Sequence, residues 1–159
     1  MEFNWYNAIM TTNKIKKATV EDVPRLAILF DQYRVFYHKE SDMAGAVSFL
    51  KDRLTREESV VFLCEREGKL AGFVQLYPLF SSTRMQRLWL LNDLFVAEEF
   101  RGQGVSKALI EASRVFGIET GACGLSLETE KTNKIANQLY LSTHWELDDE
   151  HNFYFLSTK

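Results

Sequence analysis

The chain has 159 residues, enough for one domain with a sizeable buried core. Its composition, 46% hydrophobic and 26% charged, is that of an ordinary globular protein and excludes a largely disordered chain. The net charge of −3 and the lack of a dense Lys/Arg stripe argue against a nucleic-acid partner.

Cysteines, histidines and apolar stretches exclude further classes of protein. Cys64 and Cys123 lie far apart and predict neither a disulfide framework nor a Cys/His zinc site. The histidines His38, His144 and His151 have no metal-ligand spacing, so no metal is expected. No apolar stretch approaches the roughly 18 residues of a membrane span, and the first residues lack a secretory pattern. We therefore expect a cytoplasmic protein that does not bind a membrane.

Hydrophobic periodicity predicts the elements in chain order. Residues 1–13 show no clear period and are expected to be an N-terminal extension, and 14–159 to form a single domain. The predicted elements are a strand at 15–18, a helix at 20–37 with Thr19 as its cap, a helix at 43–54, strands at 59–65, 70–77 and 88–96, a helix at 105–116, a strand at 124–127, a helix at 133–141, and strands at 145–147 and 153–156.

Local signals set several boundaries. Ser41 or Asp42 is expected to cap the second helix, since both side chains can accept a backbone hydrogen bond. Residues 66–69 read as a hairpin turn. Pro78 is expected to stop the strand before it, and Gly117 to lie beyond the end of the helix that begins near residue 105.

The order of elements predicts the sheet. Three consecutive strands joined by hairpins predict antiparallel pairing, and the strand–helix–strand unit over 88–127 predicts a parallel pair with a right-handed crossover. The fold class is therefore α/β, with a mixed, mostly antiparallel central sheet flanked by helices. A ligand is expected where the strand ends of that crossover open a crevice.

A basic, glycine-rich turn connects the strand at 88–96 to the helix that follows. Gly102 and Gly104 let the backbone approach a ligand closely, and Arg101 and Lys107 add positive charge. The unpaired amides and the dipole of a helix N-terminus favour a phosphate or pyrophosphate. No Gly-Lys-Ser/Thr follows, which excludes the ATP-binding loop, and Lys107 occupies the third glycine of the dinucleotide fingerprint.

This turn resembles the acyl-CoA pyrophosphate loop of the GNAT family of N-acetyltransferases. The family pattern is Gln/Arg-x-x-Gly-x-Gly/Ala, and the chain has Arg101-x-x-Gly104-x-Ser106, with serine at the last small position. The predicted order of elements is also that of the family. The resemblance covers nearly the whole chain and implies the GNAT acyl-CoA N-acyltransferase fold, with acetyl-CoA as co-substrate.

A second stretch is similar to the other signature of that family, Asn-x-x-Ala-x-x-Leu-Tyr followed by Gly-Phe/Trp. It runs from Asn133 to Tyr140 and continues to Trp145, with His144 where glycine is usual. A histidine tolerates the left-handed backbone conformation better than a branched residue does. The implied cofactor-binding residues are Leu94, Phe95, Val96, Arg101, Gly102, Gln103, Gly104, Val105, Ser106, Lys107 and Asn133.

Acetylation of an amine requires a base, because a primary amine with a pKa of about 10.4 is almost fully protonated at neutral pH. Asp93 and Glu128 are expected at the ends of neighbouring strands that face the crevice, and either could assist deprotonation. Each could instead be a solvated or ion-paired structural residue. The resemblance places the general acid, which protonates the departing CoA thiolate, at Tyr140.

The acceptor site resembles the polyamine and diamine branch of the family in the stretches from Tyr77 and through Asp93. That branch typically carries an acidic residue where this chain has Asn92, and a site short of one carboxylate holds a dication less well. A smaller primary amine or an amino acid therefore stays open. The expected substrate-binding residues are Tyr37, Asn92 and Asp93.

The sequence thus predicts an N-acetyltransferase that moves an acetyl group from acetyl-CoA to a primary amine, by direct attack in a ternary complex. Two alternatives stay open: a non-catalytic acyl-CoA-binding or regulatory module, and a protein or peptide N-acetyltransferase. Dimers are common in the family, so a homodimer is compatible with the resemblance.

Overall fold

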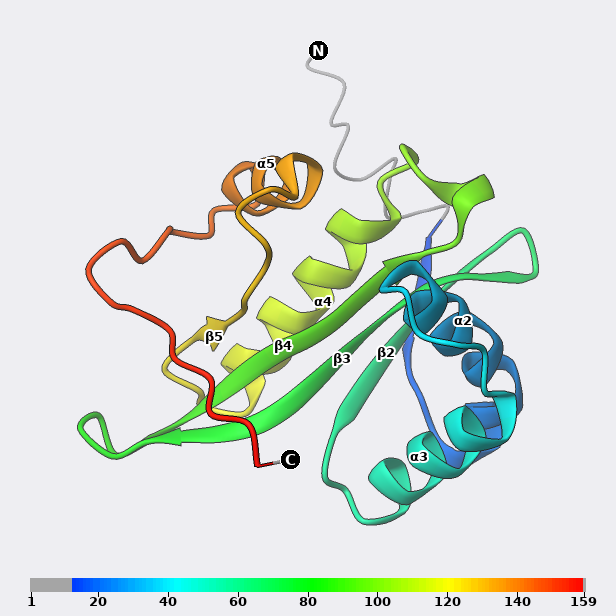
Figure 1. The fold of residues 1–159 in the computed structure, drawn as a ribbon, viewed down its shortest axis with the longest axis horizontal. Helices are drawn as coiled ribbons and strands as arrows, with labels where there is room; N and C mark the ends of the chain where they lie inside the picture. The colour runs from blue at the N-terminus through cyan, green and yellow to red at the C-terminus, as the bar shows by residue number, and fades with distance from the viewer. Residues whose placement is uncertain (1–12, 159) are drawn as a thin grey trace. The chain divides into compact units, whose positions relative to one another are not determined.

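The structure, a computed structural model, describes residues 13–158 (Figure 1). The predicted N-terminal extension therefore lies outside the described residues, apart from Asn13. The chain divides into two units, Met1–Glu128 and Thr129–Lys159, and each is described by itself. No helix of the described part is long and apolar enough to cross a membrane.

The first unit is built on a five-stranded sheet whose strands follow their sequence order. The pairs from the first to the fourth strand are antiparallel, and the fourth and fifth are parallel. This confirms the predicted mixed, mostly antiparallel sheet. The strands are β1 (Lys14–Lys17), β2 (Val60–Arg66), β3 (Lys69–Ser81), β4 (Gln86–Val96) and β5 (Leu125–Ser126).

Helices cover both faces of this sheet. The short 3-10 helix η1 (Val20–Asp22) leads into α2 (Val23–Phe36), and α3 (Met43–Thr55) packs beside it; η2 (Glu98–Phe100) precedes α4 (Val105–Glu119). Figure 1 shows α2 and α3 together on one side of the strands and α4 on the other.

Two neighbouring residues of β3 show how the faces are divided. Phe73 packs against rings of α2, with its centroid 6.0 Å from that of Tyr33. A Cβ on Gly72 would lie 3.1 Å from Val105 and 3.3 Å from Leu109, both on α4. Because successive side chains of a strand point to opposite faces, Phe73 packs toward α2 and Gly72 lies against α4. The α4 face also holds aromatic contacts, since Phe116 of α4 meets Phe62 and Trp89 of the sheet.

Several predicted boundaries are confirmed. The side chain of Asp42 accepts a hydrogen bond from the Gly45 amide at 2.8 Å, which caps α3. Arg66 pairs with Lys69 across the predicted hairpin turn, where Gly68 has a positive φ.

One strand end and one helix end differ from the prediction. β3 continues through Pro78 to Ser81. β2 pairs with β3 only as far as Leu76, so the last residues of β3 have no neighbour on that side. Pro78 therefore lies where β3 has a neighbour on one side only, which is where a strand tolerates proline. α4 continues through Gly117 to Glu119. A Cβ at residue 117 would lie 2.7 Å from Leu125, so glycine allows β5 to approach the helix.

The second unit contains one helix, α5 (Lys134–Ser142), among its described residues. The strands predicted at 145–147 and 153–156 are wrong, since neither segment is in a strand. A strand forms its hydrogen bonds only with a neighbour, and β propensity alone does not supply one. The side chains from Phe153 to Leu156 are 70–87% exposed.

Candidate active site

β4 contains an irregularity at its centre. Leu76 pairs with Leu91, and the next residue of β3, Gln75, pairs with Asp93, so Asn92 has no partner on β3. This extra residue is a β-bulge, which re-aims the side chains around it. Asn92 is exposed, whereas Asp93 is buried on the face that α2 covers.

The Asp93 carboxyl lies in a largely apolar environment. Asp93 is only 6% exposed, and burial raises the pKa of its carboxyl above the usual range. Hydrogen bonds from Asn92 and Tyr33 favour the ionised form and offset part of this shift. The Asn92 amide donates to Asp93 Oδ1 at 3.1 Å. A carboxyl group of this kind is a stronger base than an exposed aspartate.

Tyr33 is a site residue that sequence reasoning missed. The sequence does not single it out, because periodicity carries no signal for a hydroxyl directed at a carboxylate. Tyr33 also contacts Tyr37, with ring centroids 5.0 Å apart. Tyr37 is the C-cap residue directly after α2 and is 43% exposed, so the two tyrosines lead from Asp93 to the surface. The structure therefore brings Tyr37 and Asp93 to the same region.

The strand after Asp93 has one open edge. β5 pairs with β4 only at Trp89 and Leu90. The Ala97 amide donates to Ala71 on β3 at 2.9 Å, and backbone groups of a strand alternate in direction. The backbone groups of Leu94 and Val96 therefore point away from β3, toward the edge that β5 leaves unpaired.

The loop after β4 has the geometry of an anion site. Gly102 and Gly104 have φ of 71° and 80°, and Gly104 is the N-cap of α4. Amides at a helix start have no partner within the helix, so those of Val105 and Ser106 are directed out of its N-terminus. Exposed Lys107 in the first turn adds positive charge.

Two side chains hold this loop against the strand and 3-10 helix that precede it. Arg101 Nε donates to the carbonyl of Val96 at 3.2 Å, and its guanidinium lies over the ring of Phe95. Gln103 Nε2 donates to the carbonyl of Glu99 at 2.8 Å. Both residues were expected to bind the cofactor, and both also have this structural role.

The two candidate bases lie in different environments. Glu128 is exposed and follows β5 by two residues, in a stretch without regular structure. Asp93 is buried within β4. The prediction that both carboxylates end neighbouring strands is therefore only partly met, because β5 stops at Ser126.

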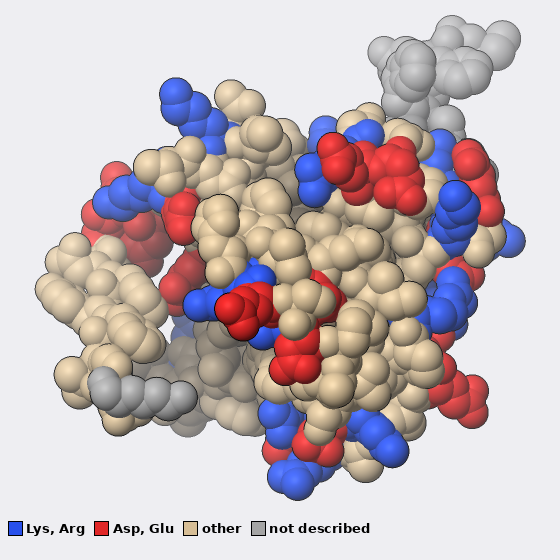
Figure 2. All heavy atoms as spheres, turned by 45° about the vertical axis from the view of Figure 1, so that its right-hand side comes forward, with Lys and Arg blue, Asp and Glu red and all other residues tan. Residues whose placement is uncertain are grey.

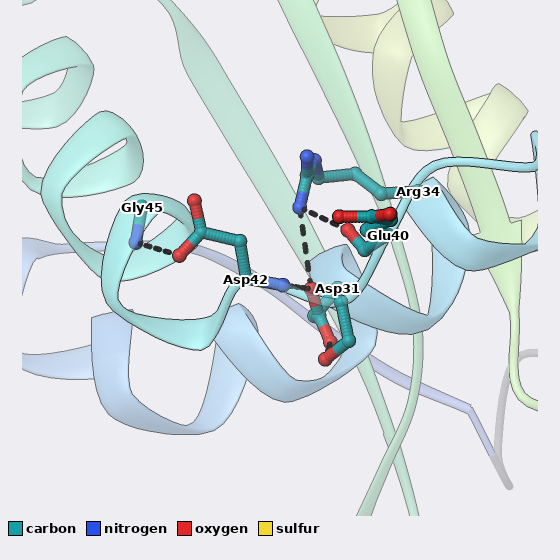
Figure 3. Close-up of polar contacts among 6 residues, drawn as sticks. Asp31, Arg34, Glu40, Asp42 and Gly45 are labelled. Atoms are coloured by element: carbon teal, nitrogen blue, oxygen red, sulfur yellow. Dashed lines mark hydrogen bonds and ion pairs between the residues drawn. The ribbon is translucent and has the colours of Figure 1, made fainter.

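A second buried carboxylate fixes the loop between α2 and α3 (Figure 3). Asp31 accepts hydrogen bonds from the Ser41 hydroxyl at 2.5 Å and from the Asp42 amide at 2.8 Å. Arg34 contacts Asp31 and the carbonyl of Glu40. The Ser41 hydroxyl, followed by the Asp42 amide and Arg34, holds the pKa of Asp31 below its usual range. This network anchors the chain directly after Tyr37.

The second unit carries the other predicted residues. Asn133 caps α5, since its Oδ1 accepts from the Ala136 amide at 3.1 Å. Tyr140 is half-buried and meets Trp145 edge-on, with ring centroids 5.8 Å apart. His144 has φ of 66°, which confirms the left-handed conformation expected where the family has glycine.

One face of the molecule carries side chains of both charges. On the face drawn in Figure 2, acidic and basic side chains are interspersed among uncharged ones. Among the described residues, no group of three or more His, Cys, Asp or Glu could hold a metal ion.

The opposite pKa shifts of Asp93 and Asp31 predict opposite effects on stability. Folded Asp93 keeps its proton to a higher pH than unfolded Asp93, so its contribution to stability is lost as pH rises through the folded pKa. We expect Asp93→Asn to raise the melting temperature at pH 8, by an amount that shrinks toward pH 5. Thermal unfolding from pH 5 to 8 measures this.

Asp31→Asn is the matched control. The pKa of Asp31 is lowered on folding, so its contribution is present at neutral pH and is lost as pH falls through the folded pKa. We expect this variant to melt below the wild type at pH 8, with a smaller deficit under acid conditions. A melting difference for Asp93→Asn that does not change with pH would contradict the assignment of a raised pKa.

The chain has clear relatives. The model of the acetyltransferase (GNAT) family matches residues 26–144. An uncharacterised N-acetyltransferase of Bacillus subtilis (strain 168), YhfO, is 43% identical over 134 residues, which are 84% of this chain and 90% of that protein.

Solved structures agree with this relationship. The crystal structure of a probable acetyltransferase matches this chain with a TM-score of 0.87 and 39% sequence identity. The match covers 92% of this chain and 98% of that protein. An aminoglycoside acetyltransferase from a soil metagenome, in complex with sisomicin, shares the fold with a TM-score of 0.79 at 24% identity, over 94% of this chain and 99% of its own. The chain therefore belongs to the GNAT family and is an acetyl-CoA-dependent N-acetyltransferase.

Proposed function

We propose that this enzyme acetylates the primary amine of a small molecule, with Asp93 as the base and Tyr140 as the acid. One observation carries the proposal: the buried Asp93 immediately precedes the open edge of β4, and the same strand continues into the anion loop. A base, a row of backbone amides and a phosphate site thus follow one another along a single segment of chain.

The residues of the loop fit the pyrophosphate of acetyl-CoA. Gly102 has a positive φ, and a Cβ built there would meet nothing within 4 Å, so its backbone is open to a ligand. The amides of the α4 N-terminus and Lys107 supply donors and positive charge. We propose that residues 101–107 hold the pyrophosphate.

The open edge of β4 fits the arm of the cofactor. The backbone groups of Leu94 and Val96 can hydrogen-bond amides of an extended ligand, and Phe95 between them is buried in the core. Bound acetyl-CoA supplies the activated acyl group. An amide directed at the acyl carbonyl stabilises the negative charge that develops there, as donors in an oxyanion hole do.

Asp93 suits the removal of a proton from the incoming ammonium group. Deprotonating an amine with a pKa of about 10.4 at pH 7 costs about 4.6 kcal/mol. A base whose pKa lies closer to neutral offsets more of this cost than an ordinary aspartate, either directly or through one water. Exposed Glu128 lacks this environment, so we favour Asp93.

The acid and the remaining cofactor contact are proposed from the family resemblance. A tyrosine with an ordinary pKa of about 10 stays protonated at pH 7, so Tyr140 can donate a proton to the departing thiolate. The side-chain oxygen of Asn133 caps α5, and we propose its Nδ2 group as the donor to acetyl-CoA.

The acceptor is proposed to carry a single ammonium group near Asp93. Asn92 replaces the acidic residue usual in polyamine acetyltransferases. Its side-chain amide donates a hydrogen bond to Asp93 and adds no negative charge. Tyr37, partly exposed at the end of α2, offers an aromatic surface to the rest of the acceptor.

The test is the release of CoA from acetyl-CoA in the presence of monoamines, diamines, polyamines, amino acids, aminoglycosides and short peptides. We expect saturable release with a small monoamine or amino acid. Selective turnover of peptides, or of polyamines over monoamines, would contradict the proposed acceptor class.

Gly102→Ala tests the pyrophosphate site. Alanine at this φ costs about 1–2 kcal/mol, and its methyl group would project into open space at the proposed site, so we expect about tenfold weaker binding of CoA by calorimetry. Gly68→Ala is the control, since Gly68 has φ of 76° and an equally open Cβ position but lies in the β2–β3 turn. Equal affinities in both variants would contradict the site.

Tyr140→Phe tests the acid. We expect kcat to fall about 100-fold with acetyl-CoA affinity unchanged, because only the proton donor is removed. Tyr154→Phe is the matched control in the same unit, since Tyr154 is 84% exposed. A rate within about twofold of wild type in Tyr140→Phe would exclude Tyr140 as the acid.

A further inference from the structure

A buried amide lies directly opposite Asp93. Gln75 of β3 is fully buried and pairs with Asp93 of β4 in the sheet register. Directly opposite residues share one face, with Cβ atoms about 4.5–5.5 Å apart, so the two side chains are within reach of each other. Neither the composition nor the periodicity of β3 singled out this residue.

Only one end of the Gln75 amide is anchored. Its Nε2 donates to the hydroxyl of Ser59 at 2.7 Å, in a bond that is itself buried. Its Oε1 is buried and has no hydrogen-bond partner among the described residues. A buried acceptor left unpaired costs about 1–3 kcal/mol, and native structures rarely keep one without a reason.

A protonated Asp93 carboxyl group can satisfy this oxygen. A carboxylate has only acceptor atoms, but a protonated carboxyl group carries one O–H donor. We infer that Gln75 is a positioning residue for Asp93: Ser59 anchors its amide nitrogen, and its carbonyl oxygen accepts a hydrogen bond from the Asp93 carboxyl when that group is protonated. This inference rests on the proposed function for its catalytic meaning, and on geometry for the contact.

The proton balance is simple. Asp93 takes one proton from the ammonium group of the acceptor, whose nitrogen keeps the electron pair used for attack. The new O–H bond of Asp93 donates to Gln75 Oε1, and the proton leaves to solvent before the next turnover. Gln75 itself gains and loses no proton. By stabilising the protonated form alone, it makes Asp93 a stronger base, in the direction that burial also acts.

Other polar groups face Asp93 from the elements around it. Asn92 and Tyr33 donate hydrogen bonds to it from β4 and α2. Tyr77 of β3 interacts electrostatically with Asp93. Burial, and to a smaller extent the charge of Asp93, raise the pKa of Tyr77 to about 12. Arg53 of α3 and Glu58 pair with each other and act on Tyr77. Gln75 is distinct among these groups because its unpaired end, an amide carbonyl oxygen, can only accept a hydrogen bond.

The experiment replaces Gln75 by methionine, which has a similar length and volume without a polar end. The Asp93 carboxyl is titrated by carbon-13 NMR in the full chain, and kcat/KM is measured against pH. In Gln75→Met we expect Asp93 to titrate at lower pH and the acidic limb of the rate profile to follow. Activity on that limb, relative to its plateau, should rise about three- to tenfold.

Two further variants make the result specific. Gln75→Glu places a second carboxyl group opposite Asp93, so the titration of Asp93 should move to higher pH. Ser113→Ala removes another fully buried hydrogen bond, from Ser113 to the Leu109 carbonyl on α4, and should move neither curve. If Gln75→Met is poorly folded, the double variant with Ser59→Ala removes both polar partners and restores a consistent apolar pair.

An Asp93 titration that is unchanged in Gln75→Met, or that moves to higher pH, overturns the inference. A titration that moves while the rate profile stays in place supports the contact between Gln75 and Asp93 and contradicts the role of Asp93 as the base. The two failures are therefore distinguishable.

Discussion

The site depends on one constraint, the burial of an ionisable carboxyl group inside a β-sheet. A buried carboxylate is costly unless it is hydrogen-bonded, and Asp93 has two donors, Asn92 and Tyr33, in a largely apolar surrounding. The bulge at Asn92 makes this possible, because the extra residue turns Asp93 onto the face that α2 covers. Aromatic rings of α2 and of the sheet pack on the same face, and Asp93 is only 6% exposed there.

The chain order from Asp93 to α4 converts this local feature into a site. Once the bulge sets the direction of the backbone, Leu94 and Val96 present their amides at the open edge left by β5. β4 ends at Val96, and the glycine-rich loop at 101–104 leads directly into α4, which begins at Val105. The proposed phosphate site therefore lies on the same segment of chain as Asp93. Asp31 stabilises the other border, where the chain leaves Tyr37.

Sequence patterns predicted the order of strands, the parallel crossover and the anion loop, because these depend on periodicity and on glycines at fixed spacing. They did not single out Tyr33 or Gln75, since the hydrogen bond of Tyr33 to Asp93 and that of Gln75 to Ser59 are made across elements and leave no periodic signal. Pro78 and Gly117 were interpreted as terminators, but their effects depend on neighbours: a missing strand beside one and a close Leu125 beside the other. The segments predicted as strands near the C-terminus have β propensity, but neither pairs with a neighbouring strand, so neither forms one.

The most direct measurement compares Asp93→Asn with Glu128→Gln, by acetyl-CoA binding in calorimetry and by turnover with the acceptor found in the amine panel. We expect both variants to bind acetyl-CoA as the wild type does, Asp93→Asn to lose about 100-fold or more in kcat, and Glu128→Gln to keep its rate. Retained turnover in Asp93→Asn, with loss in Glu128→Gln, would contradict it and make the exposed carboxylate the base.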